Sequence, residues 1–464
     1  MHPRLEAVVK AYDVRGRSPE QLDAGLARAL GAAFADETGI AAGSGFSGGQ
    51  AVIGHDMRES SPMLAAALAE GIRSRGAGVV EIGLASTDML YCASGVLDLP
   101  GVMITASHNP AGDNGLKMCR AGARPIGLET GLRTMAEAAT PLLDVPAEQP
   151  LGDLSDQVSR IDFLSTYVET LLSIAPVEGR RPLKIVVDAG NGMAGHTVPA
   201  VFDALKAAGS DFEVIGLYLE LDGTFPNHEA NPLDYSTLVD LQAAVREHGA
   251  DIGLAFDGDA DRCFVIDERA EVVAPSSITG LIATRALDLE PGATILYNVI
   301  TSKAVPEIVE ERGGTAVRTP VGHSLIKAEM ARTGAAFGGE HSGHFYFRDF
   351  YLADSGMLAA LHVMGALAEQ EGTLSELMAE FSRYAASGEI NSRVDDQNSV
   401  LETIAATYAD HEVDRLDGLT VTADDWWFNV RPSNTEPLLR LNVEGNDDAT
   451  MARVRDAVLT LIRG

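Results

Sequence analysis

Three stretches of the chain share one pattern of hydrophobic and polar positions, an apolar, β-rich run that ends in aspartate and small residues. They are AVIGHDMRESSP (51–62), LKIVVDAGNGMAG (183–195) and IGLAFDGDADR (252–262). The first two continue into helix-like stretches at 63–75 and 198–209. Strands that alternate with helices predict parallel α/β units whose functional loops lie at the strand ends.

Changes in this pattern predict where one domain ends and the next begins. A stretch that contains Pro and Asp, at 140–156, is the best linker, and further boundaries lie near residues 270 and 385. The C-terminal segment reads as strands followed by a closing helix at 451–463, which indicates an α+β module of a different kind. We therefore predict an α/β protein with three similar mixed-sheet α/β domains and a smaller α+β C-terminal domain. The predicted domains are 1–152, 153–270, 271–385 and 386–464.

Composition narrows the class of protein. The formal net charge of −32 gives a surface that repels nucleic acid and anionic membranes, so we expect neither as a partner. Cys92, Cys119 and Cys263 lack metal-ligand spacing, which indicates buried thiols in a reducing compartment. The N-terminal stretch lacks the apolar run of a signal peptide, and the run at 357–368 is too short to span a membrane. We expect a cytoplasmic protein that binds phosphate only where cations and backbone donors are concentrated.

The first segment with chemical potential is ITASHNPAGDNGLKM (104–118). An apolar strand runs into Ser107, in a turn fixed by Asn109 and Pro110, and a Gly-rich loop with Lys117 follows. Such a turn presents the hydroxyl outward, and the lysine can neutralise a phosphate there. A plain turn, in which Ser and Asn only bond the local backbone, is the alternative.

The second segment is DGDADR (257–262). Side chains at alternating positions of an extended segment point the same way, so Asp257, Asp259 and Asp261 can converge on one hard cation such as Mg²⁺. A calcium-binding EF-hand is disfavoured, because Arg262 stands where that loop needs Gly and the flanking runs are strand-like. A solvated acidic turn remains the alternative to a metal site.

The third segment is GGEHSGHFYF (338–347). Glu340 and Ser342 are two residues apart between glycines, so both can point toward a sugar whose hydroxyls they would bind, and the glycines allow close approach. A hairpin turn is the alternative.

The fourth segment is NVRPSNTEPLLRL (429–441). It places Arg431, Ser433, Asn434 and Thr435 on one turn between strands, where turn amides add further donors. This density of donors predicts a phosphate site rather than a capped turn.

Smaller pieces offer further cations. Arg15 follows a strand-like start in AYDVRG (11–16), and Arg58 follows the strand AVIGHD. His323 and Lys327 are four residues apart in PVGHSLIK, on one face if this segment is helical. Each of these alone is more often a surface or packing residue than a ligand.

Taken together and in this order, the motifs AYDVRG, TASHNP, DGDADR, GEHSGH and RPSNTEP make the chain resemble the α-D-phosphohexomutase family, and more narrowly its phosphomannomutase/phosphoglucomutase branch. The resemblance spans residues 11 to 437. It implies four domains around a central cleft, with the serine loop in the first, the metal loop in the second, the sugar loop in the third and the phosphate loop in the fourth. His341 departs from the family pattern, which often has Met there.

The resemblance also implies roles for individual residues. Ser107 would be the phosphoserine, and one Mg²⁺ would be held by its phosphate together with Asp257, Asp259 and Asp261. The groups around the transferred phosphoryl group would be Arg15, Arg58, Lys117 and Arg262, with Lys117 and His344 as candidates for proton transfer. The sugar would contact Glu340 and Ser342, with His323 and Lys327 beside it. The other phosphate would contact Arg431, Ser433, Asn434 and Thr435.

The implied reaction interconverts hexose 1-phosphates and 6-phosphates through a hexose 1,6-bisphosphate, by two transfers that begin and end on Ser107. Asn434 and the GEHSGH loop favour mannose or glucose over glucosamine phosphates. The rivals are a phosphoglucosamine mutase, a haloacid-dehalogenase-like phosphatase with Asp257 as nucleophile, and a noncatalytic sugar-phosphate-binding protein. We expect a monomer or a homodimer.

Overall fold

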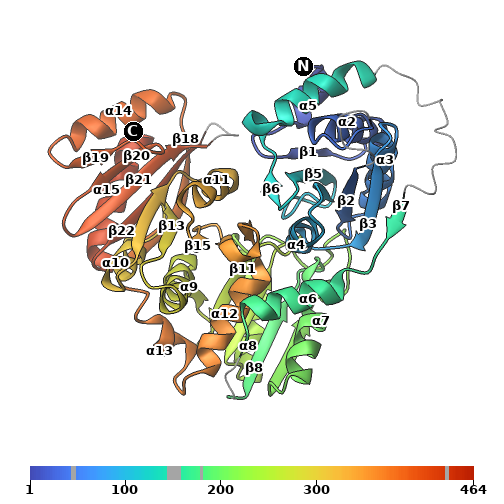
Figure 1. Cartoon of the computed structure of the whole chain (residues 1–464). Coiled ribbons are helices and arrows are strands. Elements are labelled where there is room, and N and C mark those ends of the chain that lie inside the picture. The colour runs from blue at the N-terminus through green and yellow to red at the C-terminus, as the bar shows by residue number, and fades with distance from the viewer. Residues whose placement is uncertain (43–48, 144–157, 178–180, 434–437) are drawn as a thin grey trace. The chain divides into compact units, whose positions relative to one another are not determined.

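The computed structural model describes residues 1–42, 49–143, 158–177, 181–433 and 438–464. The chain forms two compact units, each made of two segments (Figure 1). The first unit contains Met1–Val272 and Gly343–Leu374, and the second contains Val273–Ser342 and Ser375–Gly464. We describe each unit by itself.

The first sheet of the first unit has the order β1-β5-β4-β2-β3-β7, with β6 beside β5. Its strands are β1 (Val14–Arg17), β2 (Gln50–His55), β3 (Gly78–Leu84), β4 (Gly101–Ile104), β5 (Asp113–Arg120), β6 (Arg124–Pro125) and β7 (Val158–Arg160). The pairs β4/β2, β2/β3 and β3/β7 are parallel, whereas β1/β5 and β5/β4 are antiparallel. This mixed sheet therefore brings the end of β4 next to the middle of β5.

Helices cover both faces of this sheet. The helices beside this first sheet are α1 (Pro3–Val8), α2 (Ala24–Glu37), α3 (Ser61–Arg73), α4 (Thr87–Leu97) and α5 (Leu132–Ala139). α2, α3 and α5 share one core with Ala51 and Ile53 of β2. Val52, which points to the opposite face because side chains alternate along a strand, lies with Leu90 of α4 around Gly101. The predicted helix at 63–75 corresponds to α3.

The second sheet of the first unit has the order β12-β11-β10-β8-β9. Its strands are β8 (Leu183–Asp188), β9 (Phe212–Leu217), β10 (Ile252–Phe256), β11 (Cys263–Asp267) and β12 (Val272–Val273). The connecting helices are α6 (Leu164–Ile174), α7 (Ala194–Ala207) and α8 (Val239–His248). β10/β8 and β8/β9 are parallel, and β10 turns back through a hairpin into antiparallel β11. The first unit also contains the antiparallel pair β16 (Phe345–Phe347) and β17 (Ala353–Asp354), and α12 (Gly356–Ala368).

The second unit contains the parallel strands β14-β13-β15 and an antiparallel C-terminal sheet in the order β18-β22-β21-β20-β19. The first group is β13 (Thr294–Asn298), β14 (Thr315–Thr319) and β15 (Phe337–Gly339), with α9 (Pro275–Leu289), α10 (Ala304–Glu311) and α11 (His323–Thr333). The short helix α13 (Leu374–Met378) leads into the C-terminal region. The second group is β18 (Ala385–Arg393), β19 (Glu412–Asp414), β20 (Leu419–Thr422), β21 (Trp426–Pro432) and β22 (Leu438–Gly445), with α14 (Gln397–Thr407) and α15 (Asp448–Arg463).

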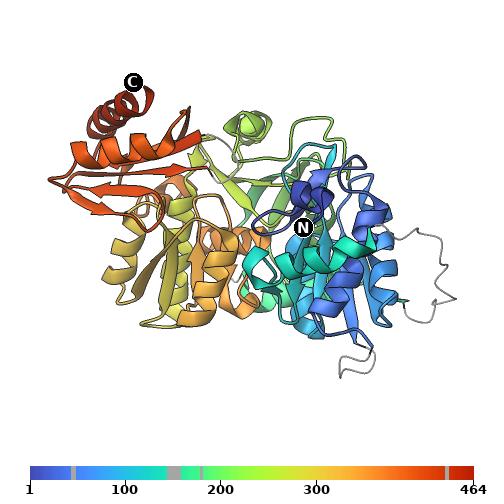
Figure 2. The ribbon, with the colours of Figure 1, turned by 90° about the horizontal axis from the view of Figure 1, so that it is seen from above.

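The C-terminal sheet carries its two helices on one face, as Figure 2 shows. Ile404 of α14 and Val454 and Val458 of α15 share a core with Phe428 and Leu441 of the strands. This module of antiparallel strands and two helices differs from the preceding α/β regions, as the sequence predicts. The predicted fold class, three mixed α/β regions followed by an α+β module, is therefore confirmed.

Candidate active site

Ser107 lies in the loop after β4 with an unusual backbone conformation. Its φ is +52°, in the left-handed region that residues other than Gly, Asn and Asp seldom adopt. Its amide donates to Oγ1 of Thr105 over 2.9 Å. Gly258 of the metal loop lies so close that a Cβ there would be 2.4 Å from the Ser107 carbonyl oxygen. The side chain of Ser107 is thus held in one place, and it is only 3% exposed.

The three aspartates of DGDADR lie in the hairpin between β10 and β11 and are almost completely buried. One oxygen from each of Asp257, Asp259 and Asp261 lies within 4.8 Å of the other two. Oδ1 of Asp259 and Oδ1 of Asp261 are buried without a hydrogen-bond partner among the described residues. Buried anionic oxygens without donors are costly, so this cluster has the composition and the unmet need of a site for a hard divalent cation. The prediction of convergent carboxylates is met by this geometry.

Lys117 and Arg262 balance the charge of these carboxylates. Nζ of Lys117 donates to Oδ2 of Asp259 over 2.7 Å and to Oδ2 of Asp261 over 2.6 Å. Nε of Arg262 donates to Oδ2 of Asp257 over 2.9 Å. Ser107 Oγ donates to the same Asp257 oxygen over 2.8 Å and accepts from Nη2 of Arg262 over 3.2 Å. The serine oxygen is therefore fixed between a carboxylate and a guanidinium.

Burial and neighbouring charges shift the pKa values of this cluster in opposite directions. Burial raises the pKa of Asp257 to about 7, against the pull of Arg262, and the like charges of Asp259 and Asp261 add to the rise. Burial works against ionisation of Asp259 as well, but Lys117 outweighs it and holds the pKa of Asp259 well below its ordinary value. Burial similarly opposes the charge on Lys117, and the two carboxylates reverse this and raise its pKa. Lys117 is thus a cation in the structure as it stands.

Arg15 and His344 complete the group in the first unit. Nη1 of Arg15 donates to the Ala106 carbonyl over 3.3 Å and to Oδ1 of Asn109 over 2.8 Å, on the serine loop. Nε2 of His344 lies 3.7 Å from Oδ1 of Asp261, and the backbones of His344 and Arg262 form an isolated β-bridge. The structure therefore brings together eight of the predicted residues. They are Arg15, Ser107, Lys117, Asp257, Asp259, Asp261, Arg262 and His344.

Arg58 makes its contacts with the backbone of the serine loop. It is 1% exposed, and all five N–H groups that a guanidinium has are engaged within the fold. The acceptors are the carbonyl oxygens of Ser107, Asn109, Pro110 and Asp113 and Oδ2 of Asp56, at 2.7 to 3.2 Å. Arg58 thus holds the serine loop through these donors, and its implied place around the transferred group stays a prediction.

Two further residues of the cluster have no place in the predicted set. Nδ1 of His108 lies 3.2 Å from Ser107 Oγ and also contacts Nη2 of Arg262. Burial, together with Arg262, lowers the pKa of His108 well below its ordinary value, so its imidazole is neutral. Thr87, the first residue of α4, donates from Oγ1 to Oδ2 of Asp259 over 2.6 Å. His108 adjoins Ser107 in the sequence, but nothing in the sequence links Thr87 to a loop 172 residues away.

The part of the predicted sugar loop that carries Glu340 and Ser342 follows β15 in the second unit, and the loop from Gly343 on belongs to the first unit. Glu340 is 2% exposed, and its Oε1 accepts from the Gly322 amide over 3.2 Å and from Nδ2 of Asn298 over 3.4 Å. Lys327 lies on α11 and is buried, so the condition under which His323 and Lys327 are one helical turn apart holds. Ser342 is the last residue of the segment Val273–Ser342 and is half-buried. His323 begins α11, and its side chain lies outside the described part of the structure.

The predicted phosphate segment contains a pair of arginines, of which only one was expected. Arg431 of β21 and Arg440 of β22 are register partners. Both donate to Glu389 of β18, over 2.9 Å and 3.0 Å respectively. Nη2 of Arg440 also lies 3.4 Å from Ser433 Oγ. Two guanidinium groups thus share one carboxylate beside Ser433. In the sequence, Arg440 is marked only by its alternating position in a predicted strand. Asn434 and Thr435 lie outside the described residues.

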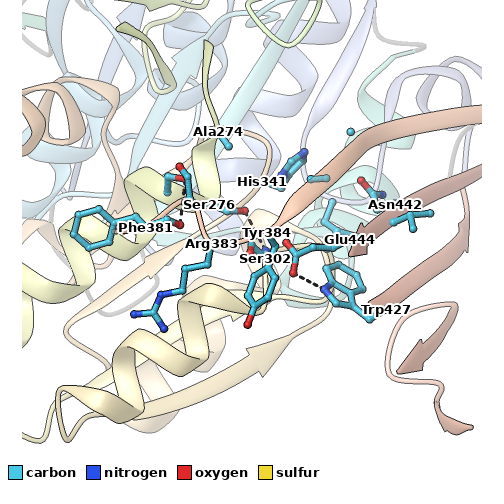
Figure 3. A pocket seen from close by; sticks show the side chains of 16 residues that line it. Ala274, Ser276, Ser302, His341, Phe381, Arg383, Tyr384, Trp427, Asn442 and Glu444 are labelled. Carbon is cyan, nitrogen blue, oxygen red and sulfur yellow. Dashed lines mark hydrogen bonds between the residues drawn. The ribbon is translucent and has the colours of Figure 1, made fainter. Parts of the chain in front are cut away.

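The second unit contains a cavity of about 80 Å³ that is lined in part by His341, as Figure 3 shows. Its walls include Trp427, Glu444 and Asn442 of the C-terminal sheet and Tyr384 before it. The Trp427 indole donates to Oε1 of Glu444 over 2.7 Å, and burial raises the pKa of Glu444. Neither Glu340 nor Ser342 lines this cavity, so it is separate from the side chains predicted to hold a sugar.

Models of four families match successive parts of the chain. They describe phosphoglucomutase/phosphomannomutase α/β/α domain I (residues 6–140), domain II (165–270), domain III (274–384) and the C-terminal domain (389–461). The chain belongs to the phosphoglucomutase/phosphomannomutase family. The predicted family is thereby confirmed.

Individual relatives of this family match over nearly the whole chain. A phosphomannomutase of Salmonella typhimurium is 39% identical over 454 residues, which cover 97% of each chain. Phosphohexose mutases of Xanthomonas campestris pv. campestris are 39% identical over 98% of this chain and 99% of their own. Among solved structures, a phosphoglucomutase/phosphomannomutase family protein of Burkholderia thailandensis superimposes with a TM-score of 0.85 and 31% identity, over 99% of this chain and 97% of that one.

These relatives support the predicted enzyme class, an intramolecular phosphotransferase of the isomerase type, and they do not favour the phosphatase or the noncatalytic binding protein. Among the described residues, no helix combines the length and the apolar character that crossing a membrane requires.

Proposed function

We propose that this chain interconverts hexose 1-phosphates and hexose 6-phosphates, with mannose and/or glucose as the sugar. The observation that carries the proposal is Ser107 Oγ, buried between Asp257 and Arg262 beside three convergent carboxylates. A hydroxyl held in this way is placed to receive a phosphoryl group whose charge a cation and a guanidinium share. Relatives named phosphomannomutase support mannose phosphates as the first substrates to test.

The proposed cofactor is one Mg²⁺ ion, held by Asp257, Asp259, Asp261 and a phosphate oxygen on Ser107. The support is the pair of buried carboxylate oxygens without donors, on Asp259 and Asp261, and the all-oxygen donor set, which suits Mg²⁺. When bound, such an ion would withdraw negative charge from the phosphoryl group during transfer.

Other side chains of the first unit act on the phosphoryl group through charge and through protons. In the proposed cycle, phosphorylated Ser107 donates its phosphoryl group to the free hydroxyl of a hexose monophosphate. The P–O bond to Ser107 breaks, the bond to the sugar oxygen forms, and the product is a hexose 1,6-bisphosphate. Arg15, Lys117 and Arg262 would neutralise the charge of the group in transit.

Proton transfer needs a group that reaches the sugar hydroxyl. Lys117 and His344 are the proposed candidates, because both lie against Asp261 within the same cluster. Lys117 is charged in the structure as it stands, so it would have to lose Asp259 and Asp261 as partners before it could accept a proton. The reverse transfer, from the other position of the bisphosphate to Ser107, would complete the isomerisation.

A bisphosphate that must present either phosphate to Ser107 needs a separate anchor for the phosphate at rest. We propose that Arg431, Ser433, Asn434 and Thr435 provide it, and we add Arg440 because it shares Glu389 with Arg431 and lies beside Ser433. Glu340 and Ser342 would bind sugar hydroxyls, with His323 and Lys327 nearby in the bound complex. A free hexose 1,6-bisphosphate would also load Ser107 at the start.

The remaining expectations stay predictions: hexose phosphates and no nucleic acid or membrane as partners, a monomer or homodimer, and a cytoplasmic location. The activity is tested by comparing rates on mannose 1-phosphate, glucose 1-phosphate and glucosamine 1-phosphate for the natural chain and Ser107→Ala. We expect conversion of one or both of the first two, at least tenfold faster than of the third, and no conversion by the variant. Turnover that persists in Ser107→Ala would exclude a mutase and favour Asp257 as a phosphatase nucleophile.

A further inference from the structure

The left-handed backbone of Ser107 has to be maintained by its surroundings. A non-glycine residue in this region is strained and persists only where the fold determines it. The conformation decides where Oγ points, because φ sets the direction of the Cα–Cβ bond. The question is therefore which groups hold the loop from 105 to 113 in place.

Arg58 holds this loop at several points along its length. Its Nη2 group donates to the Ser107 carbonyl over 2.8 Å and to the Asn109 carbonyl over 2.7 Å. Its Nη1 group donates to the Pro110 carbonyl over 2.8 Å and to the Asp113 carbonyl over 2.9 Å. One planar guanidinium thereby fixes four backbone carbonyls, and only a group with this fork of donors can do so.

The guanidinium is itself held from two sides. Asp56 at the end of β2 is fully buried, and its Oδ2 accepts from Arg58 Nε over 3.2 Å while Oδ1 accepts from Ser61 Oγ over 2.5 Å. The ring of Phe225 lies 5.1 Å from the guanidinium carbon. Gly223 of the same segment approaches so closely that a Cβ there would lie 2.6 Å from Cα of Arg58.

We propose that Arg58, covered by Phe225, is a positioning residue that sets the backbone conformation of Ser107 and so aims its Oγ at the phosphoryl group. Arg58 does not touch the substrate, because its donors are all engaged. This inference rests on the proposed function, in which Ser107 carries the group. Phe225 lies in the segment that follows β9, and this segment would affect the reaction through the contact of the Phe225 ring with the Arg58 guanidinium.

The first test replaces Arg58 by Lys. An ammonium has three donors at one point and cannot reach four carbonyls spread along the loop, although it keeps the charge beside Asp56. We expect kcat to fall about 10²-fold, the size of a misplacement of about 1 Å, with KM for the hexose phosphate changed less than threefold. Arg120→Lys is the matched control, because Arg120 also clamps backbone, donating to the carbonyls of Glu37 and Thr130. It should leave kcat within twofold.

A second readout does not depend on activity. Hydrogen exchange of the peptide that contains residues 105–113 should quicken at least tenfold in Arg58→Lys and stay unchanged in Arg120→Lys. If the natural chain exchanges this peptide slowly but converts no hexose phosphate, the proposed function fails while the clamp stands. If Arg58→Lys keeps both slow exchange and normal kcat, the clamp itself is overturned.

Phe225 provides a milder pair of variants in case Arg58→Lys does not fold. Phe225→Leu removes the ring face above the guanidinium, and Phe225→Tyr retains it. We expect Phe225→Leu to lower kcat three- to tenfold, the range of a partly desolvated cation–π contact, and Phe225→Tyr to restore it. Equal activity of the two variants and the natural chain would remove Phe225 from the proposal.

Discussion

The arginines of the two units are used differently. Around Ser107, Arg58 gives all five N–H groups to the protein, and Arg262 is tied to Asp257 and to the serine oxygen. In the C-terminal sheet, Arg431 and Arg440 share the single carboxylate of Glu389, and the Nε atoms of both are buried without a hydrogen bond among the described residues. The arginines around Ser107 are engaged within the folded chain, whereas the two arginines of the C-terminal sheet share one carboxylate, a surplus of positive charge.

This difference separates positioning from recognition. A guanidinium with every donor engaged holds structure, because binding a ligand would break bonds already made. A pair of guanidiniums with one counter-charge gains by binding an anion. A position close to a motif in the sequence does not separate an arginine that holds structure from one that binds a ligand. The number of its N–H groups that already have acceptors in the fold does. The following predictions test the contrast.

The largest effect is expected at the group that is proposed to form the covalent bond. Ser107→Ala should reduce kcat by about 10⁴-fold or more, the scale for loss of a nucleophile, in a coupled assay on mannose 1-phosphate. Ser74→Ala, which changes a hydroxyl at the end of α3, should keep the natural rate. A residual rate of one tenth in Ser107→Ala would contradict covalent transfer.

The next largest effect is expected at the three aspartates beside Ser107. Asp261→Asn removes one carboxylate from the proposed Mg²⁺ site and should lower kcat about 10²- to 10³-fold, with a higher Mg²⁺ concentration needed for half-activation. Asp267→Asn is the control, since Asp267 lies buried on β11 and accepts from the amides of Arg269 and Glu271. Chelation should abolish activity in the natural chain, and added Mg²⁺ should restore it. Full activity after chelation would exclude the metal.

The surplus positive charge predicts a different kinetic signature. Arg431→Gln and Arg440→Gln should each raise KM for the hexose phosphate about tenfold, because each removes a charged donor to the phosphate at rest. kcat should change less than KM. Arg415→Gln, in an exposed pair with Glu402, should change neither. A loss confined to kcat would assign these arginines to the chemistry and erase the contrast between the units.

The smallest effect concerns the scaffold beneath the metal loop. Nε2 of His228 donates to Oδ2 of Asp188 over 3.1 Å, and this bond raises the pKa of His228. The stabilisation is full below the ordinary pKa of His and is lost as pH rises through the raised value. We expect His228→Gln to remove about 1 kcal/mol of stability at pH 6 and little at pH 9, measured by urea unfolding. His248→Gln, on an exposed helix end, serves as the control.

The sequence predicted the family, the fold class and the enzyme class, all of which are confirmed, because these depend on local patterns. An apolar strand followed by DGDADR predicted a cluster of aspartates, since the strand and the alternation are both local. The Lys117 contacts depend on β5 lying beside β4, and they join residues 142 and 144 positions apart. Those pairings follow from tertiary packing, and no local pattern contains them.

Arg58 illustrates the limit most clearly. The sequence placed it after a strand, and the family resemblance implied a place around the transferred group. Its partners include backbone carbonyls 49 to 55 residues away. Carbonyls carry no sequence signature, because every residue has one. Thr87 could not be predicted from the sequence either, because only the fold brings its hydroxyl to Asp259.

The central claim is that Ser107 carries the phosphoryl group in transit, and a single-turnover chase tests it most directly. The chain is loaded with labelled phosphate from a hexose 1,6-bisphosphate, freed of excess reagent and mixed with unlabelled mannose 1-phosphate. We predict that the label leaves the Ser107 peptide and appears in hexose phosphates at least as fast as kcat. Label that stays on Ser107 while many equivalents of mannose 6-phosphate accumulate would contradict the account.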